Sequence, residues 1–219
     1  MSTRHLMVDC ETLADGSRAD VPVLQVGGAV FSIENGEAII HEKWSVNFGL
    51  DLATQDVVSP PVCKKTMDWW QKQPEDVRNE VFFPPALKKL YVRDPDTGDL
   101  VLVMPRDNIR GDELVSEVFG HAQGPVRLPG ETPTPFATIW ADVDDFTWLT
   151  SLFNRYNMVP PWAYNAKRDY RTVRQMAVAR NGGPLEPHPQ VGASHNGADD
   201  AVWQCHMLAK YLKVLGVEL

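Results

Sequence analysis

Residues 6–12 read Leu6-Met7-Val8-Asp9-Cys10-Glu11-Thr12, an apolar run that leads directly into two carboxylates separated by one residue. The run predicts a β-strand, in which side chains alternate in direction, so Asp9 and Glu11 share one face and Cys10 takes the other. Two acids about 6–7 Å apart along a strand can share a hard divalent cation. The alternative is a strand end that emerges into solvent, so the choice depends on whether other parts of the chain supply more acids.

Length and composition predict one globular domain over residues 1–219, with 43% hydrophobic and 23% charged residues. Three widely spaced cysteines indicate neither a zinc site nor a disulfide framework. No apolar run approaches the roughly 18 residues that cross a bilayer, and no signal peptide precedes the first strand. We therefore expect no membrane association and a cytoplasmic location.

The net charge is −8, from 21 basic and 29 acidic residues. This balance argues against a protein that coats long nucleic acid electrostatically. It is compatible with binding of a short strand end through metal ions, because bound cations would locally neutralise clustered acids. Such a protein is expected to make few phosphate contacts and to show little processivity.

An antiparallel meander is expected at the start of the chain. The apolar run 22–31 predicts a second strand, Asn35-Gly36 predicts a tight hairpin turn, and residues 38–48 predict a third strand. A hairpin over about 87–106 lies between helical segments, which favours an insertion outside the main sheet.

A helix is predicted over 63–82, with a break at Pro74. Trp69 and Trp70 lie about 100° apart on this helix, so at most one takes the centre of its buried face. The other could stack on a nucleobase, although core or rim packing of both rings is the favoured interpretation.

Further acids lie in two later segments. Asp145 stands three and four residues before Trp148 and Leu149, which places it on the inward stripe of a predicted helix that Asp142 or Asp144 would cap. The last helix begins near Asn196, a capping residue, so that His195 lies in a loop that can swing over Asp200.

In this order, the acids and the histidine resemble the three motifs of DnaQ-like 3′–5′ exonucleases of the DEDDh type. The details are similar to the phage exonuclease A (DexA) group and the related bacterial RNase AS-type exoribonucleases. The matching segments are Val8-Asp9-Cys10-Glu11-Thr12-Leu13, Val23-Leu24-Gln25-Val26-Gly27, Trp69-Trp70 with Gln73, Arg168-Asp169-x-Arg171-Thr172 and His195-Asn196. Asp144 is the alternative to Asp145 for the third acid.

The resemblance implies an α/β, RNase H-like fold, with a mixed five-stranded sheet flanked by helices. It implies two Mg²⁺ or Mn²⁺ ions held by Asp9, Glu11, Asp145 and Asp200, with His195 as the general base. It also implies substrate contacts at Thr12, Leu13, Trp69, Trp70, Arg168 and Arg171. For the arginine segment, the alternative is a solvated helix start in which Asp169 pairs with an arginine.

The expected activity is therefore 3′–5′ hydrolysis of single-stranded DNA or RNA, with release of nucleoside 5′-monophosphates. Because a contact to the ribose 2′-hydroxyl cannot be identified in one sequence, DNA and RNA both remain open. Two other hypotheses are a catalytically idle nucleic-acid-binding module on the same fold and a phosphoesterase that acts on small nucleotides. An idle module would be expected to lack an acid or the histidine, and all five residues are present.

Overall fold

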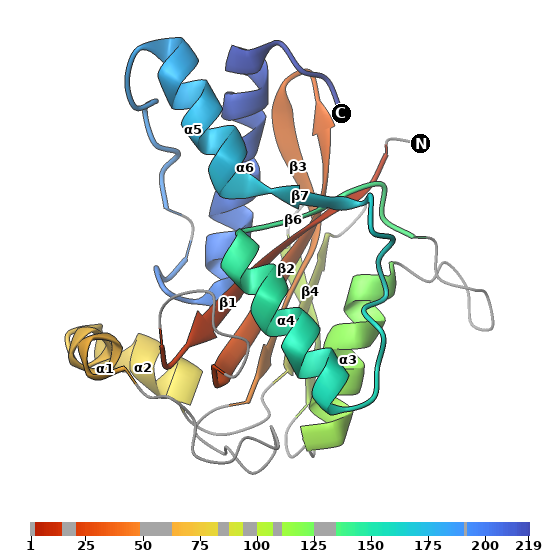
Figure 1. The fold of residues 1–219 in the computed structure, drawn as a ribbon, viewed down its shortest axis with the longest axis vertical. Helices are drawn as coiled ribbons and strands as arrows, with labels where there is room; N and C mark the ends of the chain where they lie inside the picture. Colours follow the sequence, from red (N-terminus) through yellow and green to blue (C-terminus); the bar gives the residue numbers. More distant parts are fainter. Residues whose placement is uncertain are drawn as a thin grey trace.

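A computed structural model of the protein describes residues 3–14, 21–48, 63–82, 88–93, 100–106, 111–124, 135–190 and 192–219. The predicted five-stranded sheet is confirmed as the centre of a larger sheet, and its strands are β1 (His5–Thr12), β2 (Val23–Glu34), β3 (Glu37–Asn47), β6 (Ile139–Ala141) and β7 (Lys167–Asp169). The sheet is mixed, because β1 is antiparallel to β2 and parallel to β6 (Figure 1).

The predicted meander is confirmed, since β1, β2 and β3 pair antiparallel in chain order. Asn35 and Gly36 form the turn between β2 and β3 with φ angles of 54° and 78°. Both residue types tolerate positive φ, which a tight hairpin turn requires. The pairing places Asp9 opposite Gly27 and Glu11 opposite Gln25.

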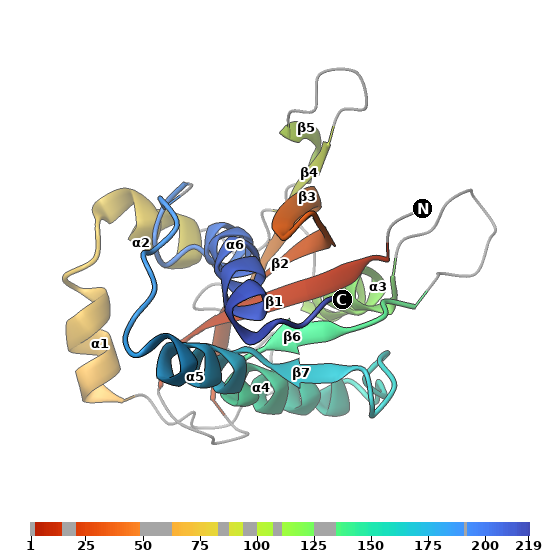
Figure 2. The same ribbon diagram turned by 90° about the horizontal axis from the view of Figure 1, so that it is seen from above.

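The hairpin was expected outside the sheet, and this expectation is wrong. Strands β4 (Lys88–Arg93) and β5 (Leu100–Arg106) extend the sheet beyond β3, which gives the order β5-β4-β3-β2-β1-β6-β7 (Figure 2). The edge of β3 would otherwise present unpaired backbone groups, and the hairpin satisfies them through β4. The residues that join β4 to β5 lie outside the described part of the chain.

The predicted helix over 63–82 is split at Pro74, as expected, into α1 (Lys64–Trp70) and α2 (Glu75–Phe82). The remaining helices are α3 (Gly111–Gln123), α4 (Val143–Arg155), α5 (Tyr170–Asn181) and α6 (Gly197–Leu215). No helix within the described ranges is both long and apolar enough to cross a membrane.

Helices cover both faces of the sheet. Leu6, Val8 and Cys10 of β1 pack in one cluster with α3 and α4, while Met7 packs in a second cluster with α5 and α6 (Figures 1 and 2). This alternation confirms that Cys10 points away from the acids. Asp9 and Glu11 therefore lie on the α6 side, at the end of β1 where α4 and α6 begin.

Candidate active site

Strand β1 supplies two acids to one end of the sheet. Glu11 is buried, with 8% of its surface exposed, and Asp9 is partly buried. The Asp9 side chain is held from the opposite helix, because Gln204 Nε2 of α6 donates a hydrogen bond to Asp9 Oδ1 at 2.7 Å.

The start of α6 is fixed against β1 and β2. The Asn196 side chain caps the helix by accepting hydrogen bonds from the backbone N–H groups of Ala198 and Asp199. Gln25 Oε1 on β2 accepts the N–H of Gly197 at 2.6 Å. Since Gly27 has no side chain, the two backbones can meet there, and a β-carbon on Gly27 would lie 2.0 Å from the carbonyl carbon of Gly197.

This docking brings Asp200 and His195 to the β1 acids. His195 has a left-handed backbone, with φ of 67°, and its N–H donates to Asp200 Oδ2 at 2.9 Å. Potential ligand atoms of Glu11, His195 and Asp200 all lie within 4.8 Å of one another, a spacing that suits a metal ion. The structure thus brings together residues from two segments almost the whole chain apart.

Asp145 joins the cluster from the first turn of α4. It is 5% exposed, its Oδ2 accepts the N–H of Asp142 at 3.1 Å, and its charge interacts with that of Asp9. Asp144 instead faces Arg171, with 3.9 Å between carboxylate and guanidinium, and Asp142 takes the cap position of α4. This arrangement favours Asp145 over Asp144 as the third acid.

The position of the carboxylates, buried and close to one another, disfavours their ionised forms. Burial, followed by repulsion from Asp200, raises the pKa of Asp9 to about 7. Burial and repulsion from Asp9 hold the pKa values of Glu11 and Asp145 well above their ordinary range. Burial also raises the pKa of Asp200, although its hydrogen bond from the His195 backbone opposes this rise. Divalent cations would relieve this repulsion, and a set of carboxylate oxygens suits Mg²⁺ or Mn²⁺.

A pocket of about 470 Å³ opens beside the acids and is lined by Glu11, Thr12, Trp69, Asp144 and Arg171, among others. The Trp69 side chain is 38% exposed, and its ring lies edge-on to that of His195, with 4.6 Å between centroids. A ring that is exposed beside the cluster is available to stack on a base.

The second tryptophan has a structural role. Trp70 is 1% exposed and donates from Nε1 to the Thr12 carbonyl at 2.9 Å. Leu13 is buried in the same apolar cluster as Trp70, so its side chain packs in the core rather than lining the pocket. Core or rim packing of both tryptophans was the favoured interpretation. It is right for Trp70, while Trp69 lies at the rim with its ring partly open.

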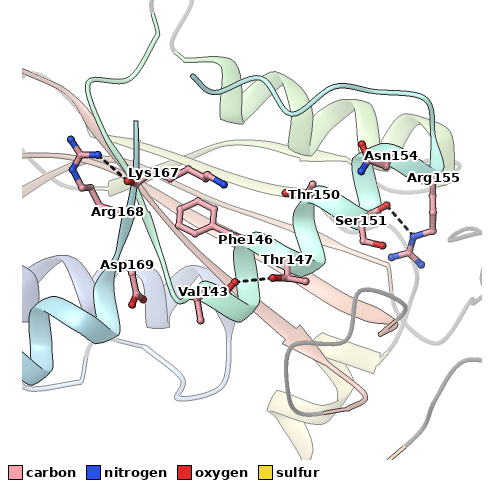
Figure 3. A pocket seen from close by; sticks show the side chains of 10 residues that line it. All are labelled: Val143, Phe146, Thr147, Thr150, Ser151, Asn154, Arg155, Lys167, Arg168 and Asp169. Carbon is pink, nitrogen blue, oxygen red and sulfur yellow. Dashed lines mark hydrogen bonds between the residues drawn. The ribbon is translucent and has the colours of Figure 1, made fainter. Parts of the chain in front are cut away.

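The two predicted substrate arginines separate. Arg171 lines the acid pocket and forms an ion pair with Asp142, whereas Arg168 is exposed and lines a second groove on the other side of α4 (Figure 3). Asp169 caps α5 by accepting the backbone N–H groups of Arg171 and Thr172, both at 3.2 Å. The helix-start interpretation of Asp169 is therefore confirmed, although it binds backbone rather than an arginine side chain.

Two features of the site were not predicted. Gln204 holds Asp9, and its position four residues after Asp200 on one helix face was the available signal. Lys43 of β3 forms an ion pair with Asp199, next to Asp200. No sequence signal connects these two residues, because the contact depends on how α6 crosses β3.

Comparisons with known proteins agree with this architecture. The family model of the 3′–5′ exoribonuclease Rv2179c-like domain matches residues 4–96 and 127–212. The structure is similar to the crystal structure of cell-death related nuclease 4 (CRN-4), with a TM-score of 0.55 and 14% sequence identity. The match covers 97% of this chain but 64% of that one. No curated protein matches the sequence.

The structural similarity concerns the fold, and the RNase H-like α/β architecture is shown. The family model covers β1, α4 and residues 197–212 of α6, and all five residues of the candidate site lie within its match. The chain belongs to the family of 3′–5′ exoribonuclease Rv2179c-like domains, and with it to the DnaQ-like exonuclease superfamily.

Proposed function

We propose that the chain is a metal-dependent 3′–5′ exonuclease of the DEDDh type that releases nucleoside 5′-monophosphates from single-stranded 3′ ends. The observation that carries the proposal is the convergence of Asp9, Glu11, Asp145, His195 and Asp200 from three separate elements at one end of the sheet. The name of the family favours RNA as the substrate. The resemblance to the phage DexA and RNase AS-type groups belongs to the same proposal, as does one exonuclease domain over residues 1–219.

Four carboxylates would hold two divalent ions. Asp9, Glu11 and Asp200 are the proposed ligands of one ion, and Asp9 and Asp145 those of the other. The four acids fit this role because burial raises the pKa values of all four and repulsion from neighbouring carboxylates adds to the rise. When bound, Mg²⁺ or Mn²⁺ stabilises charge on the phosphate and makes a water molecule more acidic.

His195 is the proposed general base, which takes a proton from the attacking water at a ring nitrogen. Its backbone is anchored to Asp200, while its ring rests edge-on against Trp69. The loop before α6 therefore fixes the backbone of His195, while the partly exposed ring can still turn towards the substrate.

Substrate contacts are proposed at the rim of the pocket. The open face of Trp69 would stack on a base near the 3′ end, and the Arg171 guanidinium would contact a phosphate. Because Asp142 and Asp144 already balance Arg171, this contact requires the guanidinium to exchange carboxylates for phosphate.

The test uses 5′-labelled single-stranded RNA and DNA of matched sequence with Mg²⁺, Mn²⁺ or EDTA. Asp145→Asn is expected to abolish a metal-dependent ladder that shortens from the 3′ end. Its neighbour provides the matched control, since Asp144→Asn removes the same charge from the same helix turn and should keep most of the activity. An equal loss of activity in both variants would contradict the assignment of Asp145. If the wild type produced a ladder on neither RNA nor DNA, the idle binding module would be favoured.

The same assay examines His195. His195→Ala is expected to lower kcat by roughly 10²–10⁴ without preventing metal binding. A variant that retains wild-type kcat would remove His195 from the mechanism while leaving the metal site in place.

A further inference from the structure

A second groove lies between α4 and the edge strand β7, separate from the acid pocket. Its volume is about 750 Å³, and it runs from Lys167, Arg168 and Asp169 along α4 to Asn154 and Arg155 (Figure 3). These residues come from β7 and from the outward side of α4, while the inward side of α4 packs in the core.

The β7 end of the groove carries two cationic side chains that form no ion pair with the described residues. Within the described residues, Lys167 lies over the ring of Phe146, 5.6 Å from its centroid, and pairs with no carboxylate. Arg168 donates through Nη1 to the carbonyls of Asn165 and Lys167, and no carboxylate in the described ranges pairs with it. The Asp169 carboxylate lines the same end and caps α5, and the two cations Lys167 and Arg168 outnumber it. In a chain with a net charge of −8, such a site suits an anionic ligand.

The floor and far side of the groove suit the sugars and bases of a nucleic acid. Phe146 lies at the floor with 8% of its surface exposed, and no protein hydrogen bond is found in the described structure for the Thr150 hydroxyl or the Asn154 amide. Donors and acceptors of this kind can form hydrogen bonds with the base edges and hydroxyls of a nucleic acid, which a site for phosphate alone would not require.

The groove and the acid pocket share one ridge. Val143 and Thr147 line the groove, and their chain neighbours Asp144 and Trp148 line the acid pocket. Arg171 pairs with Asp142 and Asp144 on this ridge, so unpaired cationic groups among the described residues lie beyond it, at Lys167 and Arg168. A strand whose 3′ end enters the acid pocket can cross this ridge, where Asp142 and Asp144 balance Arg171, and reach the cationic side chains of Lys167 and Arg168 in the groove.

We propose that the α4–β7 groove binds the nucleotides that precede the 3′ end of a single strand, with their phosphates at Lys167 and Arg168. The proposal rests on the proposed function, since it extends the path of the same substrate. It predicts that affinity rises with strand length beyond the nucleotides that the acid pocket accommodates.

The test measures binding by fluorescence anisotropy, with a 5′-labelled RNA dinucleotide and octanucleotide, Ca²⁺ in place of Mg²⁺, and several KCl concentrations. Lys167→Glu is expected to weaken octanucleotide binding roughly 3- to 10-fold, and to weaken dinucleotide binding less. The slope of log affinity against log salt should become shallower by about 0.7 for each phosphate that the variant no longer binds. Asn154→Glu, at the other end of the groove, should act in the same direction.

Lys213→Glu is the matched control, because it makes the same change in net charge near the end of α6, on the opposite face of the sheet. An equal effect of Lys167→Glu on both oligomers, or no effect on either, would overturn the proposal. If Lys72→Glu, and not Lys167→Glu, weakened octanucleotide binding more than dinucleotide binding, the strand would lie along α1. Binding and cleavage are measured separately. Length-dependent RNA binding that Lys167→Glu weakens, in a protein without nuclease activity, would refute the proposed function and still show that the groove binds a strand.

Discussion

Gln204 donates its hydrogen bond to one oxygen of Asp9 from a position one helical turn after Asp200. The Oε1 atom of Gln204 is buried and has no hydrogen-bond partner in the described part of the chain. The amide therefore fixes the orientation of the carboxylate that two metal ions would share, which makes Gln204 a positioning residue. Groups that orient metal ligands typically contribute 10- to 100-fold to metal affinity.

Gln204→Leu is therefore expected to weaken Mn²⁺ binding by about 10- to 100-fold, as measured by calorimetric titration. The Tm of this variant in EDTA should stay close to that of the wild type, since the substitution removes no core side chain. Gln175→Leu, on the exposed surface of α5, is the matched control and should bind Mn²⁺ like the wild type. Unchanged metal affinity in Gln204→Leu would limit the residue to a packing role.

Asp9 makes the metal-free protein sensitive to pH. Its pKa is about 7 in the folded state, against an ordinary value of 3.8, so the folded state retains a proton that the unfolded state has released. The free energy of unfolding therefore falls as pH rises from about 4 to about 7, and stays lower above that range. Asp9→Asn removes this contribution.

In EDTA at about pH 8, Asp9→Asn is expected to raise Tm by about 2 °C or more, and to reduce the fall in Tm between about pH 5 and pH 8. Differential scanning calorimetry measures both quantities. Asp68→Asn, an exposed acid paired with Lys64, should keep the wild-type fall. If Asp9→Asn lowered Tm at pH 8, the charge of Asp9 would be stabilising and the explanation would be wrong.

Sequence alone could indicate the five candidate residues because each stands in a local pattern: alternation for Asp9 and Glu11, helix periodicity for Asp145, and capping for His195 and Asp200. It could not separate Arg168 from Arg171. These residues are three apart, but β7 ends and α5 begins between them, so their side chains diverge to opposite sides of α4.

At the level of elements, the contact between β2 and α6 determines whether the site assembles. Gly27→Ala would place a β-carbon 2.0 Å from the Gly197 carbonyl carbon and 2.1 Å from the Ala198 nitrogen. Backbone atoms cannot move aside as a side chain can, so the start of α6 must shift, and Asp200 and His195 with it.

Gly27→Ala is expected to destabilise the protein by about 1–3 kcal/mol and to lower kcat by roughly 10²-fold. Gly120→Ala in α3 is the control, because a β-carbon there meets nothing within 4 Å. That substitution should raise stability by roughly 0.5–1 kcal/mol, since alanine is the better helix former. Chemical denaturation and steady-state kinetics test both variants. Wild-type activity in Gly27→Ala would show that activity does not require this close contact between β2 and the start of α6.

Elements formed by neighbouring residues were predictable, and those that depend on distant partners were not. The β1–β3 meander and the break at Pro74 follow from turn residues and from proline geometry. The β4–β5 hairpin has equally clear local patterns, but its place beside β3 depends on which sheet edge is left unpaired.

Over the whole molecule, two basic segments lie near the acid cluster of an otherwise acidic protein. The overall charge is −8, yet residues 64–72 contain Lys64, Lys65 and Lys72, and residues 167–174 contain Lys167, Arg168, Arg171 and Arg174. The composition predicts a protein unsuited to coating nucleic acid. It could not reveal that both basic segments flank one site, because α1 and α5 are brought there by the fold.

This charge distribution predicts distributive degradation, in which the enzyme leaves its substrate after each cleavage or after a few. With phosphate contacts at Arg171, Lys167 and Arg168, log kcat/KM should fall with log salt at a slope near −2, from about 0.7 per contact. So few contacts on an acidic protein give rapid dissociation. When excess unlabelled RNA is added after the reaction has begun, shortening of labelled RNA should stop, and intermediates of every length should have accumulated. The opposite result would be fully degraded product beside intact substrate, formed even in the presence of the competitor. It would show processive degradation, in which contacts other than these charges hold the strand.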